Sequence, residues 1–143
     1  MKKFILQFLF FICISVFQNL SAQNLQWAIR MGGTNIDSIV SIVTDASGNV
    51  YTTGCFQGTP DFDPGPGTFN LTAAGQEDVF ISKLDSAGNF LWAIRTGGTN
   101  KNFVKTILID PFGDIYSAGS LFGTADFDPS AGTFNLTAAG QED

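Results

Sequence analysis

Two pairs of aspartates have the residue type and spacing most suited to chemistry. Asp61 and Asp63 flank a phenylalanine in the motif Asp-Phe-Asp-Pro, and Asp126 and Asp128 do the same 65 residues later. Carboxylates at positions i and i+2 of a glycine-rich loop can point their oxygens into one concavity, as a hard cation such as calcium requires. The four aspartates are therefore candidate calcium ligands, and no other cofactor is expected.

A second interpretation of the same aspartates needs no metal. Calcium takes about six to eight oxygen ligands, and the loop lacks the third carboxylate and the closing acid of an EF-hand. Asp61 and Asp63 are equally suited to accept hydrogen bonds from backbone N–H groups in tight turns, with Phe62 filling an apolar pocket. The sequence leaves both interpretations open.

Catalysis is not expected within these residues, and the chain is interpreted as a non-enzyme. The acid and base of a glycosidase face each other across a cleft, whereas Asp61 and Asp63 are near neighbours on one loop. The chain has no histidine, so a Ser-His-Asp triad and histidine metal ligands are absent from it. Its basic residues are scattered and do not form a patch for nucleic acid, which is excluded as a partner.

The first 22 residues have the layout of a secretory signal peptide. Lys2 and Lys3 precede an uncharged apolar run from Phe4 to Phe17, and a polar stretch then ends at Ala22, where cleavage is expected. The apolar run is short for the roughly 20 residues that span a bilayer, so no membrane insertion is expected after cleavage. The sequence predicts a secreted or cell-surface protein with an acidic mature chain.

Residues 23–143 are a tandem repeat with a period of 65 residues. One repeat covers residues 27–91 and a partial repeat covers 92–143, with 31 of 52 aligned positions identical and no gap. The longest shared segment is the run of twelve residues from Gly67 to Asp78, which returns unchanged. Identity of this extent indicates duplication of one structural unit.

Four runs within one period have the composition of β-strands. Two links between them, Asp45–Asn49 and Asp85–Asn89, are short turns, and the third is a long loop from Gln57 to Asp78. Four antiparallel strands per repeat indicate an all-β fold of β-propeller blades. A β-solenoid or a string of small sandwiches stays open as an alternative. The four runs are Ser38–Thr44, Val50–Phe56, Val79–Leu84 and Phe90–Arg95.

Tryptophan and arginine recur together as Trp27 with Arg30 and as Trp92 with Arg95. A tryptophan on a blade strand is expected to pack in the core or between blades, with ligand stacking as the alternative. The arginine is expected to pair with a neighbouring carboxylate. Cys55 is interpreted as a small strand residue and not as a reactive thiol.

Three motifs together resemble a known family. They are Trp-Ala-x-x-x-Gly-Gly, Asp-x-x-Gly-Asn-hydrophobic-Tyr-x-x-Gly and Asp-Phe-Asp-Pro. In these motifs the chain resembles the SBBP (seven-bladed β-propeller) repeats of secreted bacterial proteins, and the similarity covers everything after the signal peptide. The resemblance implies a repetitive extracellular protein, and it brings no common catalytic residues.

The repeat starts and stops out of phase with a blade. Leu25 to Arg30 corresponds to the last strand of a blade, and the sequence stops at Asp143, where the counterpart of the third strand is due. We therefore expect an incomplete propeller fragment that associates when made alone, and whose partners include further blades of the same full-length chain.

The expected function is that of a secreted or cell-surface scaffold acting in adhesion and ligand recognition. The ligand is a protein or a carbohydrate that the sequence does not identify. The alternative is the N-terminal fragment of an exported enzyme whose catalytic part lies beyond residue 143.

Overall fold

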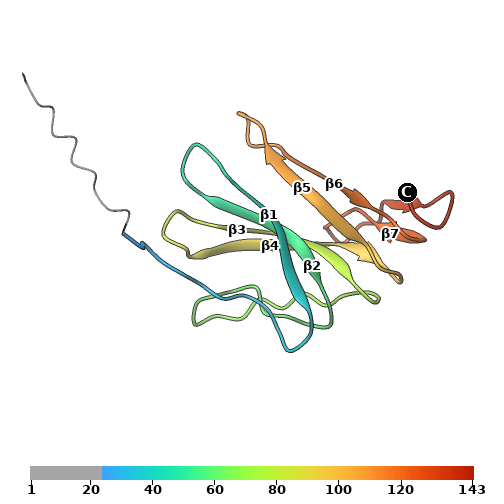
Figure 1. Cartoon of the computed structure of the whole chain (residues 1–143), viewed down its shortest axis with the longest axis horizontal. Helices are drawn as coiled ribbons and strands as arrows, with labels where there is room; N and C mark the ends of the chain where they lie inside the picture. The colour runs from blue at the N-terminus through green and yellow to red at the C-terminus, as the bar shows by residue number, and fades with distance from the viewer. Residues whose placement is uncertain (1–23) are drawn as a thin grey trace, which may run out of the picture.

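The structure is a computed structural model that describes residues 24–143. The predicted signal peptide at residues 1–22 lies outside the described residues. Residues 24–143 form strands and no helix, which confirms the all-β prediction, and they contain no helix long and apolar enough to cross a membrane. The strands (Figure 1) are β1 (Asp37–Thr44), β2 (Val50–Phe56), β3 (Asp78–Leu84), β4 (Phe90–Gly98), β5 (Phe103–Ile109), β6 (Ile115–Ser120), β7 (Thr124–Asp126) and β8 (Asn135–Thr137).

Strands β1 to β4 form the predicted antiparallel blade. Each strand pairs with the next in chain order, and β2 lies between β1 and β3. A bulge between Ile39 and Ser41 interrupts the pairing of β1 with β2, and such bulges increase the local twist of a strand. All seven residues of β2 are buried, so this strand is the centre of the blade.

An aspartate closes each short turn of the blade. In the turn between β1 and β2, Asp45 Oδ1 accepts the N–H groups of Ser47 and Asn49, both at 2.9 Å. Gly48 adopts a φ of +79° there, a conformation that side chains disfavour. The Asn49 side-chain amide is the largest of the contributions that hold the pKa of Asp45 below its ordinary value. The turn at Asp85–Asn89 repeats the arrangement, so both predicted turns are confirmed.

One face of the blade is covered by the second repeat. Tyr51, Ile81 and Ile107 form a buried cluster, with Trp92 packed against its edge. The rings of Tyr51 and Trp92 meet edge to face, with centroids 6.0 Å apart. Ile107 belongs to β5, and Figure 1 shows the β5–β6 hairpin as a separate layer beside the first blade. The prediction that the tryptophan packs in the core or between blades is confirmed for Trp92.

The other face of the blade is covered by the long loop between β2 and β3. Phe62 of this loop packs with Phe56 and Phe80 in a second buried cluster that also includes Ala93. The two clusters use alternate residues of the strands, as the period of two in a strand requires. Both faces of β2 and β3 are therefore covered, whereas β1 at the edge of the sheet is largely exposed.

Two features differ from the sequence-based prediction. Residues Leu25–Arg30, which were predicted as a strand, are not part of any β-sheet in the structure. A β-strand requires a hydrogen-bonded neighbour, and within residues 24–143 no strand lies beside this segment. Strands β7 and β8 were predicted as part of a loop. They extend the first sheet beyond β4, where Gly97 and Gly98 pair with Asp126 and Ala125.

Candidate functional site

The Asp-Phe-Asp-Pro loop is held by hydrogen bonds to its own carboxylates. Asp61 Oδ1 accepts the N–H groups of Asp63 at 3.0 Å and of Phe69 at 2.8 Å. Asp63 Oδ1 accepts the N–H of Gly65 at 2.8 Å. The Phe69 N–H, followed by that of Asp63, holds the pKa of Asp61 below its ordinary value. Both aspartates are therefore acceptors that shape the turn.

The second copy of the loop has the same geometry. Asp126 Oδ1 accepts the N–H groups of Asp128 at 3.0 Å and of Phe134 at 2.8 Å. Asp128 Oδ1 accepts the N–H of Ser130 at 2.9 Å. The bridge of Gly97 to Asp126 also corresponds to a bridge of Gly32 to Asp61 in the first copy. Residues 65 positions apart thus occupy equivalent places.

The candidate calcium ligands form no cluster of three or more acidic side chains among residues 24–143. No group of three or more Asp, Glu, Cys or His side chains suited to hold a metal ion occurs among residues 24–143. Each loop brings together only its own two aspartates, and one oxygen of each carboxylate is engaged by backbone N–H groups. The geometry favours the turn-forming role, and calcium binding at Asp61, Asp63, Asp126 and Asp128 stays a prediction from the sequence.

Calcium titration distinguishes the two roles. Because the turn geometry is complete without a cation, we expect millimolar calcium to leave the melting temperature of the chain unchanged. An Asp63→Asn variant should respond as the parent does. A calcium-dependent rise in melting temperature that is lost in Asp63→Asn would show instead that the loop binds the ion.

Phe62 anchors the first loop to the blade. It is 3% exposed, and its ring centroid lies 4.8 Å from that of Phe80 and 5.5 Å from that of Phe56. The interpretation that this phenylalanine fills an apolar pocket is confirmed. Its counterpart Phe127 is 41% exposed, because no residue of the second repeat within residues 24–143 takes the place of Phe80.

A hollow of about 420 Å³ lies beside the first loop. On one side it is lined by Asp63 and the prolines Pro64 and Pro66, and on the other by Asn89 and Phe90. Polar and apolar groups contribute about equally to the lining of this open hollow.

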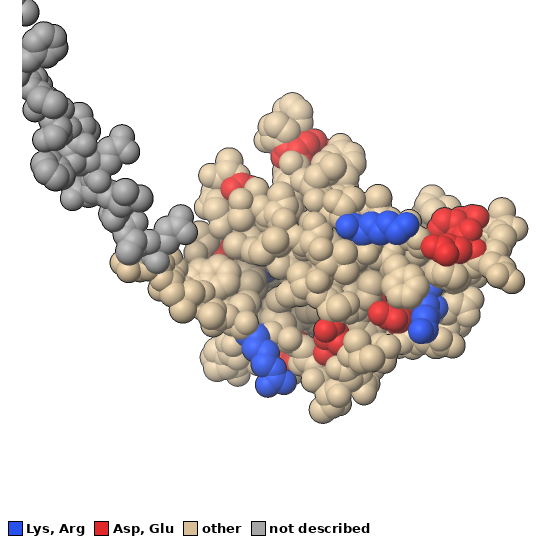
Figure 2. Space-filling view, viewed as in Figure 1, with Lys and Arg blue, Asp and Glu red and all other residues tan. Residues whose placement is uncertain are grey.

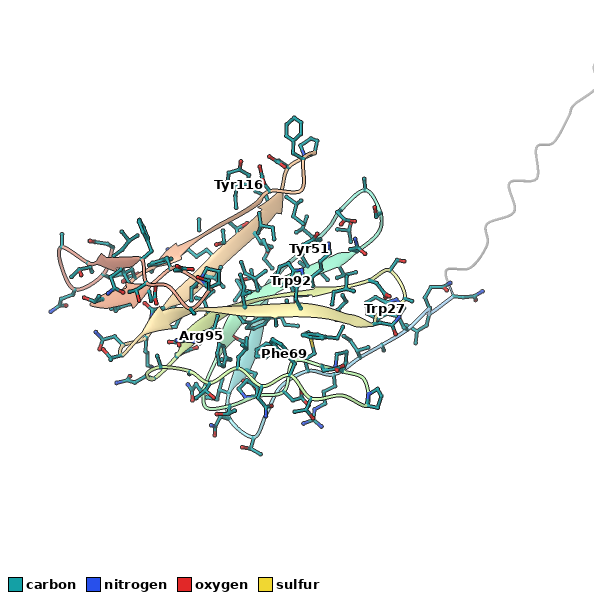
Figure 3. The ribbon with its side chains drawn as sticks, turned by 180° about the vertical axis from the view of Figure 1, so that it is seen from behind. Trp27, Tyr51, Phe69, Trp92, Arg95 and Tyr116 are labelled. Carbon is teal, nitrogen blue, oxygen red and sulfur yellow. The ribbon has the colours of Figure 1, made fainter. Side chains whose placement is uncertain are left out.

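Trp27 lies at the β3–β4 turn (Figure 3), and Gly88 of this turn also lines the hollow. Its indole N–H donates to the Ser86 carbonyl at 3.1 Å. A Cβ on Gly88 would come within 3.0 Å of the indole ring, so the ring packs directly on the turn. The contact shows packing of Trp27 against the blade, and the prediction of ligand stacking is not tested by it.

The charged residue that the sequence did not single out is Asp78. Its side chain is fully buried, and Asp78 Oδ2 accepts hydrogen bonds from Arg95 Nη1 at 2.6 Å and from the Ala74 N–H at 2.7 Å. The expectation that the arginine pairs with a carboxylate is confirmed for Arg95, which Figure 3 shows on β4. Arg30, its counterpart, is exposed.

The surface and the cysteine offer little for other chemistry. Figure 2 shows the lysines and arginines of one face separated from one another, as the scattered sequence positions predict. Cys55 is 3% exposed, and burial raises the pKa of its thiol. A buried thiol with a raised pKa is a poor nucleophile.

Comparison with known proteins gives distant similarities to two long proteins. An uncharacterised WD repeat-containing protein of Acanthamoeba polyphaga mimivirus is 31% identical in an alignment of 113 positions that covers 69% of this chain and 8% of that protein. The regulatory protein FlaEY of Caulobacter vibrioides is 26% identical in an alignment of 116 positions that covers 78% of this chain and 12% of that protein. No family model and no solved structure matches the chain.

The chain therefore spans about a tenth of the length of these curated relatives. Similarity to a WD repeat-containing protein agrees with the blade seen in the structure and indicates a repeat protein of the β-propeller type. The narrower resemblance to SBBP repeats is not confirmed by a family model.

Proposed function

We propose that this chain is part of an exported, non-enzymatic repeat scaffold that presents its long loops for adhesion and ligand recognition. The observation that carries the proposal is the equivalence of the two loops. Both repeats form the Asp-Phe-Asp-Pro turn with the same hydrogen bonds. Repetition of one surface loop suits a scaffold that holds its loops in a fixed geometry, and among the described residues the hollow lies beside the first of the two loops.

The roles of the polar residues support a scaffold. The paired aspartates accept backbone hydrogen bonds, Asp78 is buried with Arg95, and the single cysteine among the described residues is enclosed. Distant similarity to a WD repeat-containing protein supports a repeat scaffold as well. Each of these polar groups has a structural task, and none of them needs a substrate to explain its position.

The hollow beside the first loop suggests the class of ligand. The rings of Pro64, Pro66 and Phe90 offer apolar surface, while Asp63 and Asn89 offer polar groups. Such a mixture suits a neutral sugar, which has apolar ring faces and hydroxyl edges. The acidic composition of the chain disfavours anionic ligands.

Expression of the full 143-residue chain in a bacterium tests the export half of the proposal. We expect the chain outside the cytoplasm with a mass that lacks residues 1–22, so that it begins at Gln23. A Lys2→Glu, Lys3→Glu double variant should be retained in the cytoplasm. An unprocessed chain confined to the cytoplasm would contradict export.

Binding of the exported chain to an array of neutral oligosaccharides tests the recognition half. Asp63→Asn should weaken binding, whereas Asp128→Asn is the matched control because the same turn in the second repeat does not line the hollow. Equal binding by the two variants, or no binding to any sugar, would contradict recognition at this loop.

A further inference from the structure

A pair of glycines recurs at equivalent positions of the repeat. Gly32 and Gly33 come shortly before β1, and Gly97 and Gly98 end β4 shortly before β5. A glycine at the end of a strand often marks a place where another backbone approaches closely. The two pairs are therefore places to look for a contact that recurs with the repeat.

The long loop of each copy returns to this glycine pair. In the second copy, β7 pairs with the end of β4, and Gly97 lies opposite Asp126. In the first copy, the Gly32 N–H donates to the Asp61 carbonyl at 3.0 Å. Both contacts join backbone to backbone, and both use the first aspartate of the Asp-Phe-Asp-Pro motif.

The contact leaves no room for a side chain on the second glycine. A Cβ on Gly98 would meet the Thr124 carbonyl oxygen and would lie 3.0 Å from the Ala125 Cα. A Cβ on Gly33 would lie 3.2 Å from the Cα of Pro60, which is the counterpart of Ala125. Ala125 is 1% exposed, and Pro60 is fully buried. The glycine therefore lets the loop backbone close onto the neighbouring segment and exclude water.

Each long loop reaches the glycines as a hairpin. In the second copy, β7 pairs with β8, and the Phe127 N–H donates to the Phe134 carbonyl at 2.9 Å. In the first copy, the Phe62 N–H donates to the Phe69 carbonyl at 2.9 Å. A hairpin with internal hydrogen bonds loses less conformational entropy on docking than an open loop does.

The second hairpin joins two structural units. β4 is the fourth strand of the first blade, whereas β7 and β8 follow the β5–β6 hairpin, which forms a sheet of its own. Strands β7 and β8 leave that unit and complete a six-stranded sheet with β1 to β4 (Figure 1). This connection is separate from the packing of Ile107 on the face of the first blade.

We propose that the long loop is a clamp between neighbouring blades: its hairpin docks on the Gly-Gly pair, so that the hairpin and the fourth strand before it stabilise each other. In repeat proteins, stability is approximately the sum of each unit's own stability and its contacts with neighbouring units. The clamp also gives a task to the long loop that makes the period 65 residues, above the roughly 40–50 of ordinary propeller repeats. It uses the base of the loop and goes beyond ligand recognition at the hollow beside Asp63.

Substitution of Gly98 tests whether the clamp joins the two units. In the full 143-residue chain, Gly98→Ala places a methyl group against the Thr124 carbonyl, so the amides of β7 and β8 should exchange at least about tenfold faster. Gly140→Ala is the matched control, because a Cβ on Gly140 would meet nothing within 4 Å. Unchanged exchange in β7 and β8, or equal acceleration in the control, would overturn the proposal.

A substitution on the hairpin tests the contact from the other side. Asp126→Ala removes the acceptor of the Asp128 and Phe134 N–H groups and loosens the hairpin. We expect the last amides of β4 to exchange faster as well, by about threefold or more, although they belong to the first blade. Asp128→Ala is the control, because Asp128 accepts the Ser130 N–H at the loop tip. Faster exchange confined to β7 and β8 would show that the hairpin does not stabilise β4.

A double-mutant cycle measures the coupling. Once Gly98→Ala has detached the hairpin, a looser turn has less native structure left to disrupt. In that background, Asp126→Ala should therefore change the unfolding equilibrium constant in urea at least about tenfold less than it does in the parent chain. Additive effects of the two substitutions would refute the clamp.

Discussion

Replacement of Phe62 by alanine should lower the free energy of unfolding by about 3–5 kcal/mol, the usual cost of removing a buried phenylalanine. The ring is 3% exposed and contacts Phe56 and Phe80. Phe127→Ala should cost less than about 1 kcal/mol, because a side chain that is 41% exposed has less contact to lose. The two residues occupy equivalent places in the repeat, so each variant is the control for the other.

Urea denaturation of the parent chain and the two variants measures this difference. The midpoint should fall for Phe62→Ala and stay close to the parent value for Phe127→Ala, with similar slopes for all three. Equal losses at the two positions would show that both repeats enclose their phenylalanines alike. That result would contradict the open second repeat seen in the structure.

Replacement of Arg95 by alanine should also destabilise the chain strongly, by about 2–3 kcal/mol. Removal of one partner of a buried ion pair typically costs about 3–5 kcal/mol, and the value is lower here because the Arg95 side chain is 31% exposed. The cost arises because Asp78, which is fully buried, is left with an uncompensated charge. The matched control is Arg30→Ala, since Arg30 is the exposed counterpart of Arg95.

A double-mutant cycle at pH 7 measures the pair directly. Asp78→Asn keeps the shape of the side chain and an acceptor for the Ala74 N–H, which now bonds the carboxylate at 2.7 Å. In the Asp78→Asn background, Arg95→Ala should cost less by about 1 kcal/mol or more. Additive costs, or an Arg30→Ala variant as unstable as Arg95→Ala, would refute the role given to this ion pair.

The strands of the first blade were predictable because their signals are local. Val50–Phe56 was predicted with the bounds that β2 has, since Asp45–Asn49 marks its start and β-branched or aromatic residues fill it. β4 continues past the predicted Arg95 to Gly98, because Asp126 and Ala125 pair with its end. Asp126 lies about thirty residues from Gly97, so the local sequence pattern does not predict that β4 extends to Gly98.

The site was predictable only where a residue acts within its own loop. The turn-forming role of Asp61 depends on nearby N–H groups, and the motif suggests it. The pairing of Arg95 with Asp78 joins two strands, and the sequence did not indicate which carboxylate the arginine would contact. Phe62 and Phe127 lie in identical motifs, and the motif alone does not distinguish them. Within residues 24–143 only Phe62 is covered by a third strand, as the phase of the repeat predicts.

Amide hydrogen exchange across β2 and β6 tests most directly that β2 is the enclosed centre of a four-stranded blade, whereas its counterpart β6 pairs on one side only within residues 24–143. All amides of β2 should exchange slowly, because both edges of this strand are hydrogen-bonded. In β6 the amides that bond to β5 should be slow, and those on the open edge should exchange quickly. Uniform protection along both strands, or fast exchange throughout β2, would contradict this account.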